Sequence, residues 1–102
     1  MTENYTQLFV RWIEANRARL ANDKITVFLP EGFARNGTYA DFFAESGEAT
    51  VEIWDYGFSE FHALDPHTEE IKTTHHEFQS ASELYAALET LVSRMSPVLA
   101  AR

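Results

Sequence analysis

The chain has 102 residues, of which 45% are hydrophobic, 14% aromatic and 24% charged, and this composition predicts a single folded domain over residues 1–102. It contains no cysteine, which excludes a disulfide framework, a thiolate zinc site and a cysteine nucleophile. The formal net charge of -8 disfavours direct binding to nucleic acid, because affinity for phosphates depends on lysine and arginine.

The first predicted element is an amphipathic helix from about Glu3 to Ala21, and a strand from Lys24 to Leu29 follows it. Apolar residues recur at the spacing of one helical face in the first segment, at Tyr5, Leu8, Phe9, Trp12, Ile13 and Leu20. The second segment is rich in β-branched and aromatic residues and is stopped by a proline. We predict a loop from Pro30 to Asn36 after it.

The next strands predict an antiparallel meander, whose registers follow from the residues that must share a face. A two-residue turn at Ser46-Gly47 pairs apolar residues across the first hairpin, Ala40 with Ile53, Phe42 with Val51 and Ala44 with Ala49. A three-residue turn ending at Gly57 pairs Val51 with Phe61 and Ala49 with Ala63. A five-residue connection, residues 65–69, then sets Ala63 beside Ile71 and Phe61 beside Thr73.

The last predicted element is a helix from about Ser82 to Met95, where leucines repeat at helical spacing and Ser80 with Glu83 has the capping-box pattern. Pro97 ends it. The fold class is therefore α+β: an N-terminal helix, a four- to five-stranded antiparallel meander sheet and a C-terminal helix. We expect both helices to pack mainly on one sheet face, the face made of Ala40, Phe42, Ala44, Ala49, Val51, Ile53, Phe61, Ala63 and Ile71.

The same registers gather aromatic and charged side chains on the opposite face of the sheet. The candidate partner-binding residues there are Tyr39, Asp41, Phe43, Glu52, Trp54, Phe58, Glu60 and His62, accompanied by Thr50, Lys72, Thr74 and His76. Aromatic anchors among charges are typical of a protein interaction surface. A helix on each face would bury these residues instead, but Glu52 and Glu60 would lie opposite each other and their burial would be costly.

The four histidines are the candidates for a metal site or for catalysis. His75 and His76 are neighbours in a predicted strand and point to opposite faces, while His67 falls in a turn, so at most His62 and His76 share a side. The chain has no HExxH, GxSxG or phosphate-loop motif. We predict no catalytic residue, no metal and no cofactor. The alternative is a small ligand- or metal-binding domain, or an enzyme, with a site near the sheet-edge histidines.

Three segments, residues 9–20, 51–68 and 76–95, carry a resemblance to a known family. They contain Trp12 and Asn16 in the first helix, Trp54 in a strand before a turn glycine, the turn LDPHTEE and the SASEL start of the final helix. This pattern resembles the TriTu immunity proteins of bacterial polymorphic-toxin and contact-dependent growth-inhibition systems. Glu69 stands where the family usually has a turn glycine.

The resemblance implies a non-enzymatic antidote that binds and blocks the C-terminal toxin domain delivered by sibling cells, often a nuclease acting on RNA. An acidic chain suits such a basic partner. No apolar run approaches the ~20 residues that cross a bilayer and no signal-peptide pattern opens the chain, so we expect a cytoplasmic protein that does not bind membranes. When free, it is expected to be a monomer, or a homodimer that hides the aromatic face.

Overall fold

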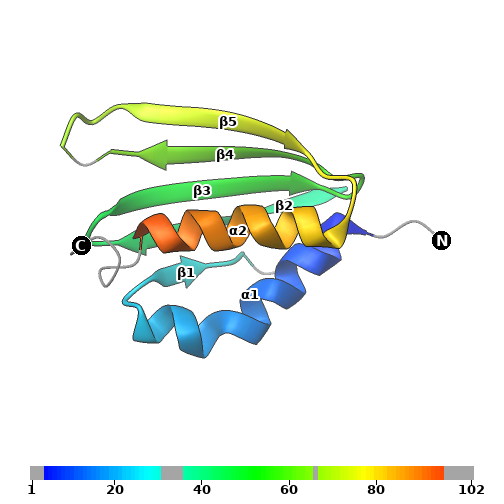
Figure 1. Cartoon of the computed structure of the whole chain (residues 1–102), viewed down its shortest axis with the longest axis horizontal. Coiled ribbons are helices and arrows are strands. Elements are labelled where there is room, and N and C mark those ends of the chain that lie inside the picture. The colour runs from blue at the N-terminus through cyan, green and yellow to red at the C-terminus, as the bar shows by residue number, and fades with distance from the viewer. Residues whose placement is uncertain (1–3, 31–35, 66, 96–102) are drawn as a thin grey trace.

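The computed structural model describes residues 4–30, 36–65 and 67–95. These residues form, in chain order, α1 (Tyr5–Asn22), β1 (Thr26–Phe28), β2 (Gly37–Ala44), β3 (Gly47–Trp54), β4 (Phe58–Leu64), β5 (Ile71–Glu77) and α2 (Ala81–Met95), as Figure 1 shows. The strands make one antiparallel sheet in the order β1-β2-β3-β4-β5. The predicted α+β meander is confirmed. Most of the predicted loop from Pro30 to Asn36, and Pro97, lie outside the described residues.

Both helices begin where side chains satisfy backbone groups that the first turn leaves free. The side-chain oxygen of Asn4 accepts a hydrogen bond from the Gln7 N–H at 3.0 Å, and α1 starts at the next residue. Before α2, the Ser80 Oγ accepts from the Glu83 N–H at 3.3 Å, and the Glu83 carboxylate accepts from the Gln79 N–H at 3.0 Å. The cap predicted from Ser80 and Glu83 is therefore present. No helix of the described residues is long and apolar enough to span a membrane.

The two helices lie beside each other against the same face of the sheet (Figure 1). The Arg19 guanidinium of α1 meets the Glu89 carboxylate of α2 at 2.8 Å, and this ion pair ties the helices together at the surface. Between helices and sheet lies one core, which contains Phe9, Trp12, Ile13 and Leu20 of α1, Leu84, Leu88, Val92 and Met95 of α2, and Ala40, Phe42, Ala49, Val51, Ile53 and Phe61 of the sheet. An arrangement with one helix on each face is excluded.

The register between β2 and β3 differs from the prediction by two residues. The turn is Glu45-Ser46 instead of Ser46-Gly47, so the pairs are Phe42 with Ala49, Ala40 with Val51 and Ala44 with Gly47. The Ser46 hydroxyl donates to the carbonyl oxygen of Met95 at 2.8 Å, which ties the turn to the end of α2. Because side chains alternate with period two, a two-residue shift leaves every residue on its predicted face.

The register between β4 and β5 differs by one residue, which has the opposite consequence. Phe61 pairs with Thr74 and Ala63 with Lys72, because the connection before β5 contains six residues and not five. Within this connection Glu69 adopts a left-handed conformation with φ of 60°, and its N–H donates to the Asp65 carbonyl at 2.8 Å. Every side chain of β5 therefore lies on the face opposite to its prediction: Ile71 does not join the core, and Lys72, Thr74 and His76 lie on the helix side.

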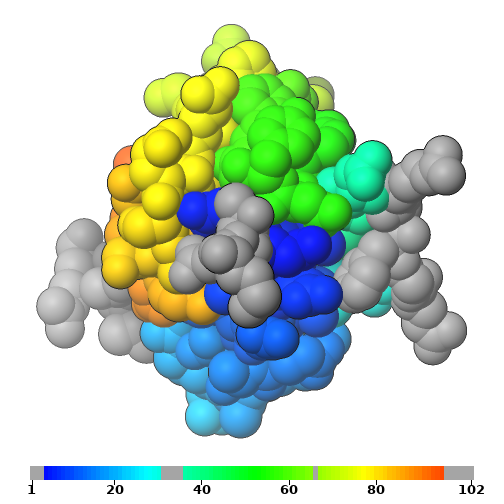
Figure 2. Space-filling model, turned by 90° about the vertical axis from the view of Figure 1, so that its right-hand side faces the viewer, coloured from blue at the N-terminus to red at the C-terminus, as the bar shows by residue number. Residues whose placement is uncertain are grey.

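Between β3 and β4 the predicted register is confirmed, with Val51 opposite Phe61, Ala49 opposite Ala63 and Glu52 opposite Glu60. Gly57 closes this turn at φ of 105°, and its carbonyl oxygen accepts from the Phe78 N–H at 3.0 Å. Nearby, the Tyr5 N–H donates to the Asp55 carbonyl at 3.0 Å. Figure 2, seen from this end, shows the green β3–β4 turn against the blue start of α1 and the yellow segment that leads into α2.

Candidate functional site

The side of the sheet that the helices leave uncovered is the candidate site. We call it the open face, and it consists of Thr26, Phe28, Tyr39, Asp41, Phe43, Glu48, Thr50, Glu52, Trp54, Phe58, Glu60, His62, Leu64, Ile71, Thr73, His75 and Glu77. All eight residues predicted to bind a partner belong to it. The three predicted neighbours from β5 do not.

The charge of the open face has one sign. It carries five carboxylates, those of Asp41, Glu48, Glu52, Glu60 and Glu77, and among its described residues there is no lysine or arginine. The prediction had placed Lys72 here, but the register of β5 puts it on the helix side. The face is therefore more acidic than the sequence alone indicated.

The centre of the open face is a polar network across β3, β4 and β5. His62 Nε2 lies 3.0 Å from Glu52 Oε1 and 3.5 Å from Glu60 Oε2, while His62 Nδ1 lies 2.9 Å from the Thr73 hydroxyl. His75 Nε2 lies 3.5 Å from the other oxygen of Glu60. These groups are all partly exposed, so a partner could reach them without unfolding the sheet.

A second hydrogen bond fixes the carboxylate on β2. The Thr50 hydroxyl donates to Asp41 Oδ1 at 2.6 Å across the β2–β3 ladder. Asp41 is thus held in one orientation, with its charge turned toward the outer surface of the sheet instead of toward the core. A fixed carboxylate loses less conformational entropy when a cation binds it.

Aromatic rings border this network on both sides. The Trp54 and Phe58 rings lie 5.4 Å apart at the β3–β4 end, and the Phe58 ring lies 6.0 Å from that of His75. On the other side Tyr39 is 41% exposed and Phe43 is 39% exposed. Large rings that keep this much exposure are unusual on a surface that only meets water, and they favour an interaction role.

Phe28 and His75 are members of the open face that the sequence prediction missed. Phe28 pairs with Asp41 and is 52% exposed. The sequence prediction gave no register for the first strand. Such a register would have placed Thr26 and Phe28 on one face and Val27 on the other. His75 was assigned to the other face by the one-residue error in β5. That strand offers no alternation of apolar and polar residues, so no signal in its own residues could have corrected the error.

His76 lies on the helix side, where its ring stacks on Phe78 at 5.4 Å and approaches Phe61 at 4.6 Å. Burial, with a smaller contribution from the charge of His75, lowers the pKa of His76. It lines a groove of about 380 Å³ between β5 and α2, together with the cationic Lys72 and Arg94 and the apolar Leu91. The pairing of His62 and His76 expected from the sequence is therefore wrong.

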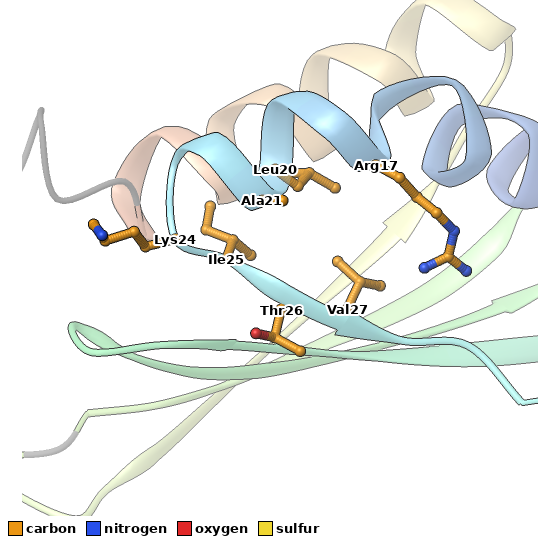
Figure 3. Close-up of a pocket in the computed structure, with 7 residues that line it drawn as sticks. All are labelled: Arg17, Leu20, Ala21, Lys24, Ile25, Thr26 and Val27. Carbon is orange, nitrogen blue, oxygen red and sulfur yellow. The ribbon is translucent and has the colours of Figure 1, made fainter.

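A second hollow of about 500 Å³ lies between the end of α1 and β1 (Figure 3). Its lining is aliphatic except for Arg17, Lys24 and Thr26, and it contains no carboxylate and no imidazole. Arg17 is already engaged by the Glu14 carboxylate at 3.0 Å, an interaction that lowers the pKa of Glu14 through its hydrogen bond. This hollow has no pair of groups that could act as acid and base.

One group of side chains in the described part of the chain has its atoms close enough to share a metal ion, namely Glu52, Glu60 and His62. It lies within the open face and includes His62, one of the histidines around which the alternative ligand or metal site was expected. His75 adjoins it through Glu60.

Comparisons with known proteins identify the family. A family model described as immunity protein TriTu matches residues 7–94, which is most of the chain, whereas no curated protein and no solved structure matched. The match spans both helices and the whole sheet. Immunity proteins bind cognate toxins and are typically not enzymes, in agreement with the prediction of a binding protein. The chain belongs to the TriTu family of immunity proteins.

Proposed function

We propose that this protein neutralises its cognate toxin domain by covering a cationic surface of that domain with the open face. The observation that carries the proposal is the charge of the face: five carboxylates surrounded by partly exposed aromatic rings, with no lysine or arginine among the described residues. Complementary charge steers association and selects the partner, while buried aromatic anchors supply most of the affinity.

The repulsion between Glu52 and Glu60 supports a cationic partner. The two residues are directly opposite each other on β3 and β4, where like charges destabilise a sheet. His62 contacts both carboxylates, but its imidazole is charged only when protonated. An arginine or lysine of the toxin placed between the carboxylates would relieve this repulsion. Part of the binding free energy would then come from removing a repulsion that is present in the unbound protein.

The partner residues we assign are Tyr39, Asp41, Phe43, Glu52, Trp54, Phe58, Glu60 and His62, as predicted from the sequence. Trp54 is the proposed anchor, because its ring packs on Phe58 at the end of the face next to the carboxylates and is only partly buried in the free protein. Large rings that are pre-positioned in this way lose little conformational entropy on binding.

The class of toxin follows from the same charge. A nuclease acting on RNA has a cationic active site that holds phosphates, and the open face would compete for those cations. Such a toxin, delivered between sibling bacteria by contact-dependent growth inhibition and met in the cytoplasm, is the partner we propose. The expected affinity is about nanomolar or tighter, with an association rate that falls as salt is added.

The first experiment is co-expression of the chain with the C-terminal domain encoded by the adjacent toxin gene. We expect a stable complex, and growth arrest when the immunity protein is omitted. An assay of RNA integrity in the arrested cells then tests the nuclease assignment separately. Intact RNA would overturn the toxin class and leave the binding function standing.

The second experiment locates the binding face. The double variant Glu52→Lys with Glu60→Lys is expected to weaken toxin binding by a factor of 100 or more, on the order of the effect of opposing charges at an interface. The matched control is Glu45→Lys with Glu70→Lys, which changes the net charge equally at two exposed connections away from the face. Equal affinities for the two double variants would show that another surface binds the toxin.

A further inference from the structure

The three side chains at the centre of the open face have the geometry of ligands around one metal ion. One ligand atom each from Glu52, Glu60 and His62 lies within 4.8 Å of the others. Two of the separations, His62 Nε2 to Glu52 Oε1 at 3.0 Å and to Glu60 Oε2 at 3.5 Å, bracket the spacing between ligands of tetrahedral zinc. That spacing is about 3.3 Å when both bonds are about 2.0–2.1 Å long.

A hydrogen bond to β5 fixes the orientation of the His62 ring. The Thr73 hydroxyl on β5 lies 2.9 Å from Nδ1, so Nδ1–H can donate to it and the Nε2 lone pair is directed toward the two carboxylates. Metal-binding histidines are held in this way by a hydrogen bond on the second ring nitrogen. Thr73 is therefore placed as the residue that orients His62.

The point between these atoms favours a cation on electrostatic grounds. In the tautomer with its proton on Nδ1, the lone pair on Nε2 faces carboxylate oxygens that are also acceptors, and in either tautomer the two carboxylates repel each other across the β3–β4 ladder. A proton on the imidazole or a metal ion at the centre removes this conflict. Only the metal ion can bond to all three atoms at once.

We propose that Glu52, Glu60 and His62 bind one divalent transition-metal ion, with the fourth position of a tetrahedral site left open to solvent. His75 Nε2 lies 3.5 Å from the other oxygen of Glu60, Oε1, so it adjoins the three ligands without belonging to the group. Mixed imidazole and carboxylate ligands suit Zn²⁺ better than Mg²⁺ or Ca²⁺, which prefer oxygen alone. The inference rests on these three side chains and not on the identity of the toxin. The ion would occupy the position that the proposed function gives to a cation of the toxin, so the two would compete for this part of the open face.

The scaffold favours such a site because its ligands come from strands and not from loops. Glu52 and Glu60 are directly opposite each other on β3 and β4, and His62 lies in the next row beside Thr73 of β5. Backbone pairing thus fixes the Cα positions of all three ligands before a metal arrives. Sites on paired strands are held more accurately than sites on loops.

The test is a zinc titration of the full-length protein, purified without a histidine tag and freed of metal with a chelator. Calorimetry is expected to show saturable binding of one Zn²⁺ per chain. Glu60→Gln and His62→Gln should each weaken that binding by about tenfold or more, as should Thr73→Val, which removes the hydrogen bond that orients the His62 ring. Titration with Co²⁺ should give the visible absorption of a four-coordinate site.

The control is His67→Gln, which removes an imidazole from an exposed connection and should leave zinc affinity unchanged. Circular dichroism confirms that each variant is folded, and the partial exposure of the ligands makes unfolding unexpected. Absence of saturable binding by the parent protein would overturn the proposal. So would equal zinc affinity of the parent protein and His62→Gln, because the ion would then be bound elsewhere.

Discussion

The two faces of the sheet are built from alternate residues of the same strands, yet they differ in composition and in exposure to solvent. On β2, Phe42 is 0% exposed beneath the helices, while its neighbour Phe43 is 39% exposed on the open face. The helix side keeps its aromatic and aliphatic side chains together in one core. The open face mixes rings with carboxylates and leaves both accessible. One strand therefore contributes to the core and to the proposed binding face through residues one position apart.

The distribution of charge repeats this division. Ion pairs on the helices, such as Arg19 with Glu89, neutralise each other, and the hydrogen bond from Arg19 lowers the pKa of the Glu89 carboxyl. The carboxylates of the open face have only histidines and a threonine hydroxyl as partners among its described residues. Charge is thus balanced between the two helices and left unbalanced on the face that we propose meets the toxin.

The sharpest test of this division is the pair of variants Phe42→Ala and Phe43→Ala. Removing the buried ring should reduce the free energy of unfolding by about 3–5 kcal/mol, because it leaves a cavity in the core. Removing the half-exposed ring should cost less than about 1 kcal/mol. Urea denaturation of both variants measures the difference. If Phe43→Ala were as costly as Phe42→Ala, the open face would be covered in the free protein, and sedimentation would then reveal a homodimer.

The turn between β3 and β4 sets the register of these two strands, and Gly57→Ala tests how much the turn contributes to stability. A Cβ at this position would lie 2.7 Å from the Phe78 carbonyl oxygen, and φ of 105° is strained for any residue with a side chain. We expect a loss of about 1–3 kcal/mol in the free energy of unfolding. Tyr56→Ala, which removes the 72% exposed ring of the preceding residue, is the control and should change little. A fully stable Gly57→Ala would mean that the turn can rearrange.

We expect the repulsion between Glu52 and Glu60 to lower the stability of the free protein while both carboxylates contribute to toxin binding. The variant Glu60→Gln tests both effects. Relief of the repulsion with Glu52 should raise the free energy of unfolding by about 0.2–1 kcal/mol, with a larger gain at low salt. Toxin affinity should fall at the same time. The control is Glu77→Gln, which lies on the same face opposite the uncharged Phe58. A less stable Glu60→Gln would show that the contacts of Glu60 with His62 and His75 outweigh the repulsion.

The sequence was sufficient to predict the order of elements and the β3–β4 register, because apolar residues alternate on both strands and Gly57 marks the turn. It was insufficient for β5. That strand reads IKTTHHE, and its two sets of alternate residues are nearly equal in polarity, so neither set identifies the buried side. The register there depends on the length of the preceding connection. The connection has six residues, including the left-handed Glu69, and the five-residue connection that we predicted placed His75 on the wrong face.

The eight predicted binding residues were placed on one face correctly because all of them lie on β2, β3 and β4. The β3–β4 register was predicted correctly, and the two-residue shift of β2 does not change the face on which its side chains lie. The network inside the face could not be predicted. It depends on which side chain of β5 approaches Glu60, and on the rotamer of His62, which Thr73 fixes through a hydrogen bond. Such details follow from packing in three dimensions and have no pattern along the chain.

Glu69 is the left-handed residue in the connection before β5, and Glu69→Gly tests the cost of its conformation. Glu69 has φ of 60°, a conformation that costs a residue with a side chain about 1–2 kcal/mol and glycine almost nothing. Glu69→Gly removes this strain, but glycine loses more backbone entropy on folding, so the net gain should be a few tenths of a kcal/mol and a rise of about 1–3 °C in the thermal midpoint. Glu69→Ala keeps the strain and should show no such gain. A destabilised Glu69→Gly would mean that the carboxylate itself, and not the backbone conformation, holds the connection that brings His75 onto the open face.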